Sequence, residues 1–239
     1  DTGTAFQTTE YKYMGYGTGG TYNPLKFVCA SSAYARGATG DGIKVAVLDT
    51  GVKTANTSGA TNTNHSDLGQ VVDFTSGSDA RFSDDTPNDN NGHGTHVAGI
   101  IGARGDNGIG VAGVAWGVKI MPVVVLSGCM GFESDCALGI QWATDNGADV
   151  INYSLQYSTG TQVFRDAASY AHAQGLIQVA ASGNTFDPDD VQAPARFAEV
   201  IAVASVDNRD SRVFNSSQGP EVDFAAAGWQ VYSSIGTNQ

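Results

Sequence analysis

The stretch Lys44-Val45-Ala46-Val47-Leu48-Asp49-Thr50-Gly51 decides the fold that this sequence predicts. Its apolar residues form an unbroken run that ends at a carboxylate. Such a run is typical of a strand that is buried on both faces of a parallel sheet. We therefore expect a central strand over residues 42–48, with Asp49 at its carboxyl end.

Segments of the same character recur along the chain and alternate with helical patterns. Further strands are expected at residues 71–74, 119–126, 149–155, 176–181 and 200–206, helices at 33–36, 96–103, 134–146 and 162–174, and loops at 53–66 and 79–92. Strands that alternate with helices build parallel sheets through βαβ units. The sequence thus predicts an α/β fold in three layers, a mostly parallel twisted sheet with helices on both faces. An irregular N-terminal arm over residues 1–32 is expected to precede it.

The composition restricts the class of protein. Of the 239 residues, 41% are hydrophobic, which is enough for a core and too many for a disordered chain. The 24 acidic and 12 basic residues give a formal net charge of −12. Because phosphates call for basic side chains, we expect neither nucleic-acid binding nor attachment to an anionic membrane. The sequence also has no apolar stretch long enough to cross a bilayer.

The three cysteines leave two interpretations open. Cys129 and Cys136 are seven residues apart around a glycine-containing stretch, so that a disulfide between them would close a small loop. Such a bridge suits an exported protein, whereas two independent thiols are the alternative. Cys29 is left over, either as a buried thiol or with a partner outside this sequence.

The carboxyl ends of the strands are where an α/β sheet places its ligands. Asp49 ends the first strand, and a buried carboxylate there needs a hydrogen-bonded partner. His93 is a candidate partner, because glycines on both sides allow a ligand or backbone to approach closely. A carboxylate bonded to one ring nitrogen fixes the tautomer and leaves the other nitrogen free to act as a general base.

Taken singly, these residues allow plainer interpretations. An aspartate at a strand end often forms a turn or caps a helix, and a histidine between glycines is usually a loop residue. His93 and His96 also have the i, i+3 spacing of metal ligands, but no cysteine, third histidine or HExxH-type motif accompanies them nearby.

Three motifs together make this chain resemble the subtilisin-like serine proteases. Val45-Ala46-Val47-Leu48-Asp49-Thr50-Gly51 is similar to the family motif around the catalytic aspartate. His93-Gly94-Thr95-His96-Val97-Ala98-Gly99 resembles the catalytic histidine motif, and Ala180-Ala181-Ser182-Gly183-Asn184 resembles the motif of the oxyanion-hole asparagine. The motifs follow the family's order, and the similarity implies that residues 33–239 belong to a catalytic domain.

The resemblance implies a role for each of these residues. Asp49 orients His93, His93 acts as general base, and Asn184 donates its side-chain amide to the developing oxyanion. An extended peptide is expected between two edge segments, held by main-chain hydrogen bonds. The implied substrate-binding residues are Cys129, Met130, Gly131, Ser154, Leu155, Gln156, Ala181 and Ser182. Gln156 stands where the family often has glycine, so we expect it to narrow or reshape the first specificity pocket.

The resemblance also implies a structural calcium ion. Asp67, in the segment His65-Ser66-Asp67-Leu68, matches an aspartate that ligates calcium in the family. The loop from Arg104 to Val111 resembles one that wraps the same ion with oxygen ligands, which calcium prefers. This loop is longer by one residue, so Asp106 and Asn107 compete for the side-chain position. The implied ligands are Asp67, Arg104, Asp106, Asn107, Ile109 and Val111.

The family's nucleophile motif, Gly-Thr-Ser-Met-Ala, does not occur among the 239 residues. By resemblance, residues 214–233 correspond to the region just before that motif, and the sequence stops roughly one short loop before the serine. Because covalent acyl transfer requires a nucleophile, these residues alone are expected to be inactive. We therefore expect a C-terminal remainder of the same protein that carries the serine.

The leading hypothesis is thus the N-terminal portion of a secreted serine endopeptidase that acts on polypeptides. The alternative is a serine-less pseudoprotease that binds peptides. The presence of Asp49, His93 and Asn184 disfavours this alternative, because a binding module does not need that set. A calcium-binding structural protein without an active site is the third and weakest hypothesis.

Overall fold

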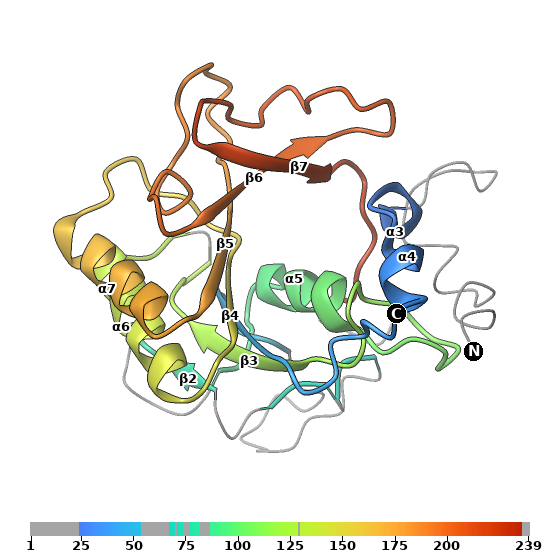
Figure 1. The fold of residues 1–239 in the computed structure, drawn as a ribbon. Helices are drawn as coiled ribbons and strands as arrows, with labels where there is room; N and C mark the ends of the chain where they lie inside the picture. Colours follow the sequence, from blue (N-terminus) through green and yellow to red (C-terminus); the bar gives the residue numbers. More distant parts are fainter. Residues whose placement is uncertain are drawn as a thin grey trace.

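One parallel sheet organises the part of the chain that the computed structural model describes, namely residues 24–53, 67–69, 71–73, 77–81, 87–128 and 130–235. Its strand order is β2-β3-β1-β4-β5-β6-β7, with every neighbouring pair parallel. Figure 1 shows the central strands with β6 and β7 at one edge. The strands are β1 (Lys44–Asp49), β2 (Ser78–Asp79), β3 (Lys119–Val124), β4 (Val150–Tyr153), β5 (Ile177–Ala181), β6 (Ile201–Val206) and β7 (Val222–Ala227).

Helices cover both faces of this sheet. Figure 1 shows α6 and α7 together on one side and α5 on the other. The helices are α3 (Pro24–Phe27), α4 (Ala30–Tyr34), α5 (His93–Gly102), α6 (Glu133–Asp145) and α7 (Gln162–Ala173). The predicted α/β class, with a parallel sheet between helical layers, is confirmed. Among the described helices, none is long and apolar enough to cross a membrane.

Successive side chains of the central strand enter different cores. Leu48 of β1 belongs to a buried cluster that includes Ile140 of α6 and Phe164 of α7. Its neighbour Val47 belongs to a second cluster, which includes Ala98 of α5. Because side chains alternate across a strand, an unbroken apolar run fills both cores at once. This is the physical reason why the run at residues 44–48 forms the centre of the sheet.

The helices α6 and α7 begin and end close to where their sequence patterns predict. Helix α6 has two acidic residues, Glu133 and Asp135, in its first turn, where they complement the helix dipole. The predicted helices at 134–146 and 162–174 agree with α6 and α7 to within one residue at each end.

The structure differs from the sequence prediction mainly at short or glycine-rich segments. Helix α5 begins at His93 rather than at residue 96, and its first turn packs closely against the chain after β1. A Cβ on Gly94 would lie 2.1 Å from the carbonyl oxygen of Gly51. The sequence pattern took these glycines as loop residues, whereas the fold uses one of them for close packing.

Other differences concern the edges of the fold. β2 and β7 were not predicted, and around residues 71–73 the structure has only an isolated bridge between Val72 and Ile120. Residue 74 and residues 1–23 lie outside the described part of the chain. Within the expected irregular arm, residues 24–27 are helical, and the helix expected at 33–36 spans residues 30–34 instead.

The replacement Phe164→Ala tests the core beneath α7. Phe164 is 0% exposed and makes edge contacts with the rings of Tyr157 and Phe197. Its loss leaves a cavity, so the free energy of unfolding is expected to fall by about 3–5 kcal/mol. The neighbouring Val163→Ala is the control, because Val163 is 53% exposed. Its effect should stay within about 0.5 kcal/mol. If urea unfolding showed that both variants lose the same free energy of unfolding, this assignment of the core would be contradicted.

Candidate active site

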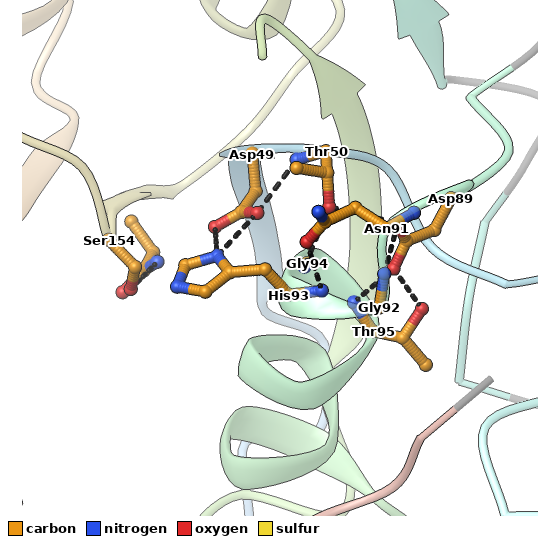
Figure 2. A network of polar contacts seen from close by, with 10 residues as sticks. Asp49, Thr50, Asp89, Asn91, Gly92, His93, Gly94, Thr95 and Ser154 are labelled. Atoms are coloured by element: carbon orange, nitrogen blue, oxygen red, sulfur yellow. Dashed lines mark hydrogen bonds and ion pairs between the residues drawn. The ribbon is translucent and has the colours of Figure 1, made fainter. Parts of the chain in front are cut away.

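Asp49 and His93 form a direct pair at the carboxyl end of β1. Asp49 is 0% exposed, and Nδ1 of His93 lies 2.7 Å from its Oδ1 and 2.9 Å from its Oδ2. Figure 2 shows the imidazole edge turned toward this carboxylate. The backbone N–H of Thr50 also donates to Oδ1, at 2.7 Å. An ionised carboxylate can only accept, so the contact places the proton of a neutral His93 on Nδ1.

The other ring nitrogen of His93 is available for chemistry. Nε2 has no hydrogen bond to any residue in the described ranges, and the side chain is 51% exposed. In Figure 2, Ser154 lies on that side of the ring, with no bond drawn between them. An imidazole whose Nδ1–H is held by a carboxylate and whose Nε2 is open is arranged to accept a proton.

A second buried carboxylate, Asp89, holds the N-terminus of α5 in place. Asp89 is 1% exposed and accepts the backbone N–H groups of Asn91, Gly92 and Thr95, at 2.8, 2.8 and 3.0 Å. The hydroxyls of Thr50 and Thr95 also donate to it, at 2.9 and 2.5 Å. The N–H of Thr95 is one that a helix start leaves unpaired, and those of Asn91 and Gly92 belong to the turn that leads into α5, at the positive end of its dipole.

Thr50 connects the strand end to the helix start. Its Oγ1 accepts the backbone N–H of Gly94 at 2.9 Å and donates to Asp89. Thr50, the residue after Asp49, is therefore bonded to Gly94, the residue after His93. This bond keeps the side chains of Asp49 and His93 close together. The sequence reasoning placed residues 79–92 in a surface loop and missed Asp89. An acidic residue a few positions before a glycine-rich helix start is the signal that would have indicated a cap.

The electrostatics of the two histidines on α5 differ. The hydrogen bond to Asp49 raises the pKa of His93 above its usual value, against an opposing effect of burial. The negative charges of Asp49 and Asp89 raise this pKa further. For His96, burial and the neighbouring His93 lower the pKa instead. Only His93 is placed to exchange a proton with the cleft.

A cleft of about 980 Å³ brings His93 together with most of the predicted substrate-binding residues. From the predicted set, it is lined by Met130, Gly131, Ser154, Leu155, Gln156 and Asn184. The cleft is also lined by residues that the sequence reasoning did not assign to substrate binding, namely Arg81, Leu126, Ser127, Gly128, Phe132, Asp135 and Tyr157. They lie in loops or at a helix start, where no periodic pattern indicates which way a side chain faces.

Asn184 follows β5 and is held at two points. Its backbone N–H donates to Oε1 of Gln156 at 2.6 Å, and its Oδ1 accepts from Nδ2 of Asn215 at 3.3 Å. Its own Nδ2 makes no hydrogen bond to a residue in the described part of the chain. That donor is therefore free to bind an oxygen of a bound substrate.

Two of the predicted substrate-binding residues do not line this cleft. Ser182 is 1% exposed, and its hydroxyl donates to the backbone oxygen of Ser217 at 2.9 Å. Ser182 and Ala181 are not among the residues that line the cleft. Cys129 lies outside the described residues.

The predicted disulfide between Cys129 and Cys136 requires a correction, because the structure has Cys136 as a free thiol. Cys136 is 0% exposed on the buried face of α6, with its Sγ 3.4 Å from the hydroxyl oxygen of Tyr157. Burial raises the pKa of this thiol to about 12. Sequence spacing gave no information on the direction of the side chain, which points into the core.

The loop predicted to bind calcium does wrap around Asp67, which is 3% exposed. Nδ2 of Asn107 donates to its Oδ1 at 3.2 Å, and the backbone N–H of Val111 and the hydroxyl of Ser234 donate to its Oδ2 at 3.0 and 2.8 Å. The backbone N–H of Arg104 bonds to the carbonyl oxygen of Asp67.

Two other predicted ligands, Asp106 and Ile109, have exposed side chains. Asn107 rather than Asp106 is the side chain that contacts Asp67. Within the described ranges, no group of three or more acidic, histidine or cysteine side chains is arranged to hold a metal ion. The segment His65-Ser66 lies outside those ranges.

Comparison with known proteins matches this chain to one protease family. A model of the subtilase family, Peptidase_S8, matches residues 40–239. Subtilisin DY of Bacillus licheniformis is 37% identical over 220 residues, which cover 90% of this chain and 74% of that protein. The minor extracellular protease Epr of Bacillus subtilis is 34% identical over 240 residues, covering 96% of this chain but only 34% of Epr.

A solved structure of a cold adapted subtilisin-like serine proteinase superimposes with a TM-score of 0.70 at 34% identity. The match covers 82% of this chain and 67% of that one. The chain therefore spans only part of the length of the proteins it matches, from about a third to three quarters.

The pair of Asp49 and His93 predicts a specific pH dependence. In the native protein, the imidazole of His93 should titrate above the usual 6.5, and Asp49→Asn should lower its pKa. Because the folded pKa is raised, this pair stabilises the fold fully below pH 6.5, and the contribution is lost as the pH rises through the folded pKa.

NMR titration of the imidazole protons of His93 in the native protein and in Asp49→Asn checks this prediction. If Asp49→Asn left the pKa of His93 unchanged, the described contact would be contradicted.

Proposed function

The chain belongs to the subtilase family, and from this premise we propose that it is a secreted serine endopeptidase that hydrolyses peptide bonds through an acyl-enzyme. The observation that carries the proposal is the 2.7 Å contact between buried Asp49 and Nδ1 of His93, beside a cleft that Asn184 also lines. Secretion is supported by the likeness to Epr, a protease named as extracellular.

In the proposed reaction, His93 moves the protons. Nε2 accepts the proton of a serine hydroxyl while the serine oxygen bonds to the scissile carbonyl carbon. His93 then gives this proton to the leaving amine as the C–N bond breaks, and water releases the acyl group by the reverse route. Asp49 keeps Nδ1 protonated and stabilises the charged imidazolium between these steps.

Asn184 is proposed to stabilise the oxyanion that develops on the carbonyl. Its Nδ2 is the one side-chain donor left free by the contacts of its backbone and its Oδ1. A fixed donor acts more strongly on charge that develops in the transition state than on the neutral carbonyl. The segments at residues 130–131 and 154–156 line the same cleft and are proposed to hold an extended polypeptide substrate.

The nucleophile is proposed to be a serine outside residues 1–239. The family motif that carries it is absent from these residues, and the matched relatives are longer than the matched region. Residues 1–239 alone are therefore proposed to bind peptides without cleaving them.

Two replacements in the full-length enzyme test the proposed roles. Asp49→Asn should lower kcat by about 10⁴-fold, because the asparagine favours the wrong imidazole tautomer. Asn184→Ala should lower kcat by about 10²–10³-fold, the loss known for this donor in a subtilisin, with little change in KM. Both are measured by hydrolysis of a chromogenic peptide amide.

Asp166→Asn, at an exposed position of α7, is the matched control and should leave kcat unchanged. Full activity of Asp49→Asn would contradict the proposal. Peptide binding by the full-length protein without hydrolysis would favour the peptide-binding alternative.

We also propose a structural calcium ion at Asp67. The residue types fit such an ion, because a buried carboxylate, the amide of Asn107 and the carbonyls of Arg104, Ile109 and Val111 offer oxygen ligands. The N–H and O–H groups that now bond to the carboxylate would compete with the ion. Bound calcium would hold the loop after α5 against the segment of Asp67 and so stabilise the fold.

Thermal unfolding with and without a chelator checks the calcium proposal. If calcium is present at 100 times its Kd, the native protein should gain about 2.7 kcal/mol over the chelated form. Asp67→Asn should abolish this gain, whereas Asp106→Asn, exposed in the same loop, should keep it. An identical Tm of the native protein in calcium and in chelator would contradict the site.

A further inference from the structure

The loop that carries Asn184 lies along a second segment, residues 214–218. The backbone N–H of Ser217 donates to the oxygen of Gly183 at 2.9 Å, and the N–H of Phe186 donates to the oxygen of Asn215 at 3.4 Å. The rings of Phe186 and Phe214 are 5.4 Å apart between centroids. The two segments are thus joined by backbone bonds on both sides of Asn184.

Ser217 contacts both chain neighbours of Asn184. It is 0% exposed, and its Oγ accepts the backbone N–H of Thr185 at 3.2 Å and lies 2.8 Å from Oγ1 of Thr185. Its own N–H is bonded to Gly183. One buried serine therefore holds the residues immediately before and after the proposed oxyanion donor, without lining the cleft itself.

The chain at Gly183 is shaped to allow this contact. Gly183 has a φ of 121°, a conformation that favours glycine, and a Cβ there would lie 2.8 Å from Oγ of Ser217 and 2.6 Å from Cγ of Gln192. The close approach of Ser217 and the turn at Gly183 thus depend on each other. Together they set the direction in which the next residue, Asn184, leaves the end of β5.

We propose that Ser217 is a positioning residue for Asn184, so that the orientation of the oxyanion donor depends on a buried hydroxyl that never touches substrate. The inference rests on the proposed function, because it assigns a support to the donor named there. A donor is effective only when it stays close to its hydrogen-bonding position, ~2.7–3.1 Å from the oxyanion. A small shift of residues 183–185 therefore lowers kcat and leaves ground-state binding nearly intact.

The chain offers a matched control in the adjacent serine. Ser216 is 3% exposed, and its Oγ accepts the backbone N–H of Ser205 at 2.9 Å and lies 3.4 Å from Oγ of Ser182. Its hydroxyl is also 3.5 Å from the backbone oxygen of Ser217, but it makes no hydrogen bond to Gly183 or Thr185 in the described part of the chain. Ser216→Ala therefore removes a buried hydroxyl with similar bonding from the same segment, but leaves the bonds around Asn184 in place.

The experiment measures kcat and KM of the full-length enzyme on a peptide amide. Ser217→Ala should lower kcat by about tenfold or more, up to the ~10²–10³-fold of losing the donor itself, with KM within about twofold. Ser216→Ala should leave kcat within about twofold, although both variants lose a buried hydrogen bond and should show a lower Tm. Equal kcat values for the two variants would overturn the proposal.

A double replacement separates this inference from the proposed function. In an Asn184→Ala background, Ser217→Ala should cause no further loss of kcat, because the donor it positions is gone. A further loss equal to that in the native background would overturn the positioning role. If Asn184→Ala alone leaves kcat unchanged, the oxyanion role itself fails. If Asn184→Ala is severe and Ser217→Ala has no effect, only the inference fails.

Thr185→Val is the second variant should Ser217→Ala not fold. It removes the hydroxyl partner of Ser217 at constant side-chain size and is expected to lower kcat in the same direction, by less. An unchanged kcat for a folded Thr185→Val enzyme would count against the proposal.

Discussion

The hydrogen bond between Asp49 and His93 is the constraint on which the rest of the site depends. A carboxylate that is 0% exposed destabilises the fold unless it has partners, and Asp49 finds them in His93 and in the N–H of Thr50. Helix α5 must therefore start within reach of the end of β1. Asp89 and the glycine at position 94 make that close approach possible.

The strand order then determines which loops meet His93. β1 lies between β3 and β4, and β5 follows β4, so the carboxyl ends of all four strands share one edge of the sheet. The loops that leave this edge carry Met130, Ser154 and Asn184, all of which line the cleft with His93. Parallel topology thus gathers residues from distant parts of the sequence into one site, as is general for α/β proteins.

The sequence alone predicted the features that depend on a local pattern of residues, and it missed those that depend on contacts between distant segments. The apolar run at residues 44–48 and the helices α6 and α7 have strong local patterns, and motifs singled out Asp49, His93 and Asn184. Asp89 was missed because its role depends on donors from two segments that the fold brings together, the end of β1 and the start of α5. The disulfide at Cys136 was wrong because spacing does not reveal which helix face a thiol occupies. β7 was missed because its side chains are largely exposed, so its alternation is weak.

Covalent labelling of the full-length protein with a fluorophosphonate is the most direct test of the central claim, that Asp49 and His93 activate a serine. The account predicts that mass spectrometry finds one modified serine, located outside residues 1–239, and that His93→Ala abolishes the modification. No modified serine, or a modification that persists at the same rate in His93→Ala, would contradict the account.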